Sequence, residues 1–210
     1  ALFGWTTVEV PMGGFTYRRV EAGGERQAGL MPLDPNYGLP SHWMPYLAVD
    51  DVDEVVAAVE GLGGARCVPP MDMEGVVRFA VVEDPAGTPI TAFHPAAEGR
   101  DLSNRNHHGW FCWDDLSVPD PYRVIPFYTA LVGWQVDTSH SGQGPYHVVS
   151  APGSSGPGSR IGGIMQRPEG GDARPMWTPY VFVDDIDTAT ARAVELGAAL
   201  DMGPYDAGDV

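Results

Sequence analysis

The chain has 210 residues, of which 43% are hydrophobic and 19% are charged, and its formal net charge is −16. This composition is typical of a globular protein with one large or two modest cores. The acidity argues against nucleic acid or an anionic membrane as partner, because both attract basic surfaces. From the apolar runs and the first residues we expect neither a membrane span nor a secretory leader.

The two cysteines, Cys67 and Cys112, lie in apolar, strand-like runs without metal-ligand spacing. We expect both to be buried free thiols, which is typical of a reducing compartment. These features predict a cytoplasmic protein. The oligomeric state stays open between a monomer and a homodimer.

The segment 45–64, PYLAVDDVDEVVAAVEGLGG, predicts a strand followed by a helix. Asp51 is the expected cap, apolar residues then recur at helical spacing, and Gly63 is the expected end. Three strand-like runs follow, and proline and glycine form a turn between the last two. The predicted order is therefore β, α, β, β, β. The three runs are ARCVPP, VVRFAVVED and TPITAFHP.

A second unit of the same order begins at residue 112. A strand through Trp113 precedes an expected helix at 121–134, within which Pro126 disfavours continuity. Three strand-like runs then follow, and the strand and helix of the first unit return at 179–198 as PYVFVDDIDTATARAVELGA.

The chain repeats itself throughout, which is decisive for the fold. ALFGW at residue 1 returns as ALVGW at residue 130. Tyr17 matches Tyr146 and Gly29 matches Gly163, with five extra residues in the second copy, which we place in the loop APGSSGPGSR. The repeat predicts two domains, 1–97 without its first strand and helix and 107–210 without its last strands, joined by a linker at 98–106.

These motifs together resemble the vicinal oxygen chelate superfamily, which holds glyoxalase I, bleomycin-resistance proteins and extradiol dioxygenases. The likeness lies in FYTALVGW, ALFGW, VDDVD, VDDID and DPAGTPI, and it most closely resembles a two-domain actinobacterial glyoxalase-like branch. The resemblance implies an α+β fold, in which tandem βαβββ modules pair into two cup-shaped mixed sheets with the helices outside. Trp5 and Trp134 would pack helix against sheet.

Members of the superfamily usually hold a divalent metal through His, Gln or Glu on the first and fourth strands of a module. Here the corresponding positions carry no such residue. On first strands they are Met44, Trp113 and Thr178, and on fourth strands Thr91 or the glycines and methionines Gly29, Met31, Gly163 and Met165. We therefore expect no metal, unless a strand register has slipped by one residue and exchanged the faces. The six histidines are interpreted as solvated or structural.

Residues two apart on a strand share a face, so the inward side chains can be assigned. Asp115 is the one inward carboxylate, and it is a candidate general base or ligand acceptor. The pockets suit a flat, partly polar molecule, although the aromatic residues could equally fill a closed core. The candidate ligand-binding residues are Trp113, Asp115, Met165, Thr178 and Tyr180 in the second cup, and Met44, Tyr46, Thr91 and Phe93 in the first.

Three functions remain open. The leading prediction is a metal-free glyoxalase/bleomycin-resistance-like protein that binds a small organic molecule, such as an antibiotic or an aromatic metabolite, without a cofactor. The second is a glyoxalase-type lyase or dioxygenase with a divalent metal. The third is a non-catalytic scaffold with filled cups.

Overall fold

The computed structural model describes residues 2–12, 14–73, 77–95, 105–141, 144–153, 157–167 and 174–206. The chain forms two compact units, one of residues 1–42, 104–112 and 180–210 and the other of residues 43–103 and 113–179. The domain boundaries derived from the repeat stay a prediction. Most of the predicted linker lies outside the described residues, as do residues 154–156 of the predicted insertion loop.

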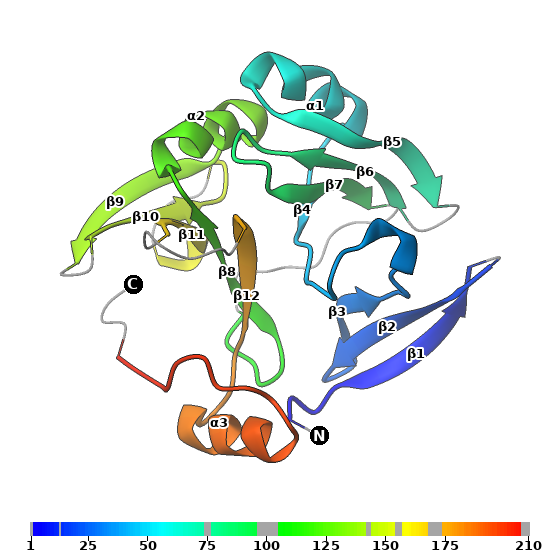
Figure 1. Ribbon diagram of the computed structural model, residues 1–210, viewed down its shortest axis with the longest axis vertical. Coiled ribbons are helices and arrows are strands. Elements are labelled where there is room, and N and C mark those ends of the chain that lie inside the picture. The colour runs from blue at the N-terminus through cyan, green and yellow to red at the C-terminus, as the bar shows by residue number, and fades with distance from the viewer. Residues whose placement is uncertain are drawn as a thin grey trace. The chain divides into compact units, whose positions relative to one another are not determined.

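Two βαβββ modules are complete (Figure 1). In each, the first strand pairs in parallel with the fourth, and the remaining pairs are antiparallel, so the sheet orders are β4-β7-β6-β5 and β8-β11-β10-β9. The predicted α+β fold with tandem modules and mixed sheets is confirmed. The elements are β4 (Tyr46–Ala48), α1 (Val52–Val59), β5 (Ala65–Met73), β6 (Val77–Glu83) and β7 (Pro89–Pro95), then β8 (Phe111–Val118), α2 (Pro121–Val132), β9 (Gln135–Ser141), β10 (Gly144–Ser150) and β11 (Arg160–Gln166).

The other two modules are partial. An antiparallel sheet of β1 (Thr6–Pro11), β2 (Thr16–Ala22) and β3 (Glu25–Leu30) corresponds to the last three strands of a module. β12 (Met176–Val181), which lies next to β8 in its sheet, and α3 (Ile186–Glu195) correspond to the first two elements. In the described residues after α3 no strand forms. A strand needs a neighbouring strand to satisfy its backbone groups.

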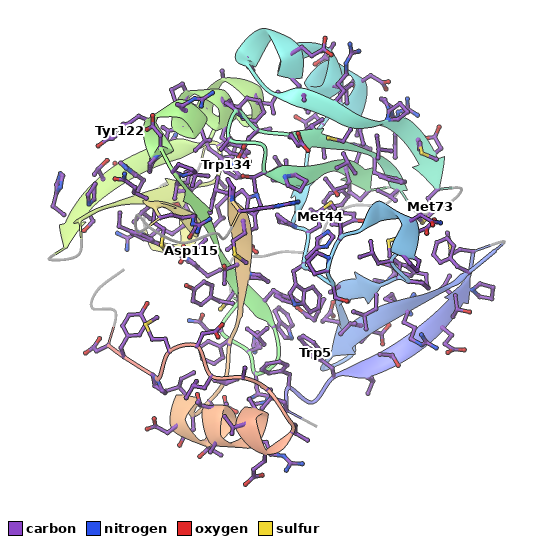
Figure 2. All side chains as sticks on the ribbon, in the orientation of Figure 1. Trp5, Met44, Met73, Asp115, Tyr122 and Trp134 are labelled. Carbon is purple, nitrogen blue, oxygen red and sulfur yellow. The ribbon has the colours of Figure 1, made fainter. Side chains whose placement is uncertain are left out.

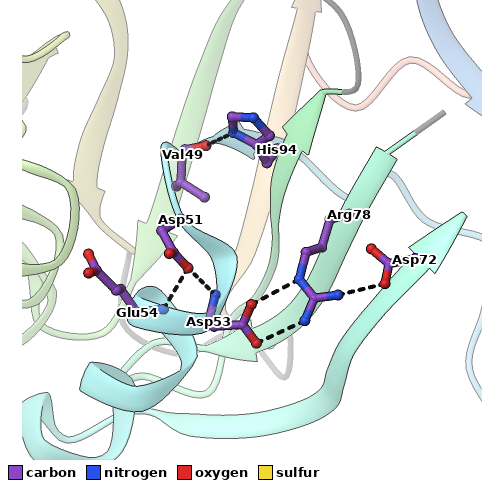
Figure 3. A network of polar contacts seen from close by, with 7 residues as sticks. All are labelled: Val49, Asp51, Asp53, Glu54, Asp72, Arg78 and His94. Atoms are coloured by element: carbon purple, nitrogen blue, oxygen red, sulfur yellow. Dashed lines mark hydrogen bonds and ion pairs between the residues drawn. The ribbon is translucent and has the colours of Figure 1, made fainter. Parts of the chain in front are cut away.

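Aspartates begin the described α-helices, and Asp51 is a cap that the sequence predicts. Asp51 Oδ1 accepts the backbone N–H groups of Asp53 and Glu54 at 2.8 and 3.0 Å (Figure 3). Asp120 and Asp185 cap α2 and α3 in the same way. Because an N-cap acceptor satisfies amides that the helix leaves unpaired, each cap stabilises its helix by about 1 kcal/mol. The helix α2 continues through Pro126, which is exposed, so water can meet the carbonyl that loses its donor.

Arg78 on β6 ties the first turn of α1 to its sheet. Its guanidinium meets both carboxylate oxygens of Asp53 at 2.9 Å and one oxygen of Asp72 on β5 at 2.8 Å (Figure 3). Both aspartates are largely exposed, so solvent screens the pairs and their main effect is to orient the helix.

Apolar residues from one face of each sheet pack against α1 and α2. The helix α1 lies against the sheet of its own module (Figure 1), and its four buried valines belong to this core. Leu116 and Val118 of β8 and Ile164 of β11 belong to the same core. Trp134 follows α2 and stacks on Tyr128 with ring centroids 4.7 Å apart, which confirms its predicted scaffold role.

Trp5 is held differently from its repeat partner. Its indole N–H donates to the carbonyl of Gly109 at 2.7 Å, and its ring contacts Phe3 and Phe111. It therefore packs against an aromatic group at the start of β8 rather than between a helix and a sheet.

Both cysteines are free, but the prediction that both are buried is wrong, because Cys67 is exposed and Cys112 is half-buried. Cys67 lies on β5, an edge strand that pairs only with β6, and the register shifts around it, which leaves its side chain exposed. No helix among the described residues combines the length and apolar character needed to cross a bilayer.

A buried carboxylate joins the two complete modules. Asp84, which is 2% exposed, accepts the N–H groups of Ala86 and Thr88 at 2.8 and 3.0 Å and the hydroxyl of Tyr128 on α2 at 3.1 Å. Burial raises the pKa of Asp84, while these donors favour its charged form.

Replacing Tyr128 with Phe is expected to reduce the free energy of unfolding by about 1.5–3 kcal/mol, because it removes a donor to a buried carboxylate. Tyr122→Phe, on the exposed side of the same helix, is the control and should change stability by less than about 0.5 kcal/mol. Urea unfolding measures both. Equal effects of the two variants would contradict the role of this bond.

Candidate functional site

β8 presents two chemically different faces. Leu116 and Val118 are fully buried in the helix-side core, while Trp113, Asp115 and Ser117 alternate with them on the opposite face. The predicted grouping of Trp113 and Asp115 on the face away from the helix therefore matches the structure. Figure 2 shows Asp115 on this strand.

Hydrogen bonds link three polar side chains on this face. The indole N–H of Trp113 donates to Asp115 Oδ1 at 3.0 Å and to the hydroxyl oxygen of Tyr146 at 2.9 Å. The hydroxyl of Tyr146 donates to the same Asp115 oxygen at 2.6 Å. Asp115 is 5% exposed, so these bonds offset much of the cost of burying its carboxylate.

Gly163 creates the space for Tyr146. It lies beside Asp115 on the parallel strand β11, and its other neighbour is Val148 on β10. A Cβ atom at residue 163 would collide with the phenol of Tyr146 and lie 2.7 Å from Asp115 Oδ1. The tyrosine therefore lies across the position that a side chain would otherwise occupy.

The first copy repeats this arrangement. Tyr17 on β2 and Gly29 on β3 are the counterparts of Tyr146 and Gly163, and a Cβ at residue 29 would collide with the Tyr17 hydroxyl. Sequence reasoning paired these residues as repeats but did not include Tyr146 among the site residues. The signal that could have found it was a tyrosine and a glycine repeating together.

The predicted residues of the first cup come together on β4 and β7. Thr91 is buried, and its hydroxyl donates to the sulfur of Met44 at 2.9 Å. Tyr46 and Phe93 meet edge to face with centroids 5.7 Å apart. Its polar groups are the hydroxyls of Thr91 and Tyr46, and none of the four side chains is charged at neutral pH, so the group offers contact area rather than charge.

The remaining predicted residues of the second cup are only partly linked to the Trp113 group. Met165 follows Gly163 by two residues on β11 and lies opposite Tyr146. Thr178 on β12 is exposed, and it alternates with Trp177, which is buried in the core. Tyr180 is 41% exposed and belongs to the other compact unit.

A resident metal would have to be held by these same groups, and they do not fit one. An indole N–H and a phenol both donate to Oδ1 of Asp115, and the neighbouring positions Gly163 and Met165 add no oxygen or imidazole. Within the described ranges no three His, Cys, Asp or Glu side chains gather closely enough to hold an ion. His42 and His94 each bond a backbone carbonyl, and His108 pairs with Asp184.

Residues 110–208 match the family described as "Glyoxalase-like domain". The chain is 31% identical over 211 residues to "Putative glyoxylase CFP32" of Mycobacterium tuberculosis, covering 98% of this chain and 78% of that protein. The chain belongs to the glyoxalase-like family of the vicinal oxygen chelate superfamily.

Other relatives of this glyoxalase-like protein extend the comparison. "Anthracycline biosynthesis protein DnrV" of Streptomyces peucetius is 29% identical over 223 residues, with 98% of this chain and 78% of DnrV covered. A Mn(II)-bound glyoxalase from Novosphingobium aromaticivorans has a similar fold, with a TM-score of 0.53 and 18% identity over 92% of this chain and 64% of its own. A 2,2',3-trihydroxybiphenyl 1,2-dioxygenase from Sphingomonas wittichii has a TM-score of 0.54 and 13% identity over 94% and 71%.

His147 lies on the helix side of β10, one residue from Tyr146. It is 1% exposed, its Nδ1 is 2.9 Å from the Thr138 hydroxyl, and its ring meets Tyr122 at 5.4 Å. Burial and the nearby His140 lower its pKa. In this glyoxalase-like protein His147 is therefore a structural residue, as the sequence predicts.

Replacing Gly163 with Ala is expected to lower the free energy of unfolding by about 1–3 kcal/mol, because the added methyl must displace the Tyr146 ring. Gly61→Ala is the matched control, since a Cβ there meets nothing within 4 Å. Urea unfolding of both variants measures the difference. A neutral Gly163→Ala would contradict the close packing.

His147 should make stability fall in acid. The pKa of His147 in the folded state lies below its unfolded value of about 6.5. The unfolded state therefore binds the proton more readily, and stability is lost as the pH falls below about 6.5 toward the folded pKa. The His147→Gln variant lacks this titration, so the stability difference between wild type and variant should shrink from pH 7.5 to pH 5. Urea unfolding across this range measures it, and parallel pH curves would contradict the assignment.

Proposed function

We propose that the protein binds a small, flat, partly polar organic molecule on the Trp113 face of β8, without a metal. The observation that carries this proposal is the hydrogen-bonded group of Trp113, Asp115 and Tyr146. It lies where metal-binding members of the vicinal oxygen chelate superfamily hold their ion. Two aromatic rings provide contact area, and one buried carboxylate provides an oriented polar centre.

The donor chemistry supports binding without an ion. Asp115 Oδ1 already accepts two donors, and the indole N–H that points at it has no lone pair with which to coordinate a cation. A second metal-coordinating side chain would have to come from β11, where the residues are Gly163 and Met165. Neither side chain offers an oxygen or an imidazole.

The relatives favour an aromatic ligand. DnrV is named for anthracycline biosynthesis, and a neighbour of similar fold is named for a trihydroxybiphenyl substrate. By analogy, we propose that the ligand of this protein is a flat aromatic molecule about the size of anthraquinone. Binding of such a molecule would make the protein a carrier, a resistance protein or an enzyme that acts through side chains alone.

Two alternatives have their own supporting observations. A metal-dependent lyase or dioxygenase is favoured by the Mn(II) in the glyoxalase of similar fold. A scaffold without a ligand is favoured by the extent to which Trp113, Asp115 and Tyr146 satisfy one another.

Titration with 2,6-dihydroxyanthraquinone, followed by equilibrium dialysis, tests the proposal. We expect saturable binding at one site, unchanged after dialysis against EDTA and confirmed as metal-free by elemental analysis. Trp113→Phe should weaken binding about tenfold, because an aromatic contact is worth about 1 kcal/mol and the indole N–H is lost as well.

The control is Trp43→Phe, an exposed tryptophan outside this face. It should leave the affinity within twofold of wild type. If the purified protein holds a stoichiometric metal, and EDTA removes both the metal and the binding, the metal-dependent alternative would be established. Absence of binding to every flat aromatic probe would establish the scaffold.

A further inference from the structure

We draw no further inference here: the strongest candidate, the outer edge of β4, where the backbone groups of the exposed residues Tyr46 and Ala48 point away from β7, carries nothing, because nothing in the described residues shows what covers it.

Discussion

The strict alternation of side chains along β8 and β11 is the constraint on which the rest depends. Leu116 and Ile164 face the helices, and this forces Asp115 and Gly163 to the other side. A shift of one residue would bury the carboxylate among leucine and valine and expose those side chains to water. The apolar core therefore fixes the register, and the register fixes the chemistry of the opposite face.

The polar group on that face owes its geometry to three strands. β8 contributes an indole and a carboxylate two residues apart, and β10 contributes a phenol. On β11, Gly163 has no side chain and so leaves room for that phenol. Each part is ordinary by itself. Together they form a centre whose donors all point inward at one oxygen, which is a suitable arrangement for orienting a ligand and an unsuitable one for a cation.

Much of this could be predicted from the chain alone, because its periodicity and repeats are strong. The module order, the Asp51 cap, the faces of β4, β7 and β8, and the core position of Trp134 all follow from local patterns. Tyr146 was missed because its role comes from a contact across two strands, and no property of strand β10 by itself indicates that Gly163 will lie beneath the ring. The exposure of Cys67 was missed for a related reason, since an apolar run does not reveal that its strand lies at an edge with a shifted register.

The ring that lies over Gly163 also limits how this protein can change through mutation. A Glu or His at residue 163 would need the volume that the phenol fills, so one substitution cannot introduce an ion-coordinating side chain there. The tyrosine would first have to become small, and the intermediate would carry an empty space beside an under-bonded carboxylate. Residues 146 and 163 should accordingly covary in size among homologues, large with small, and the same reciprocity should link residues 17 and 29.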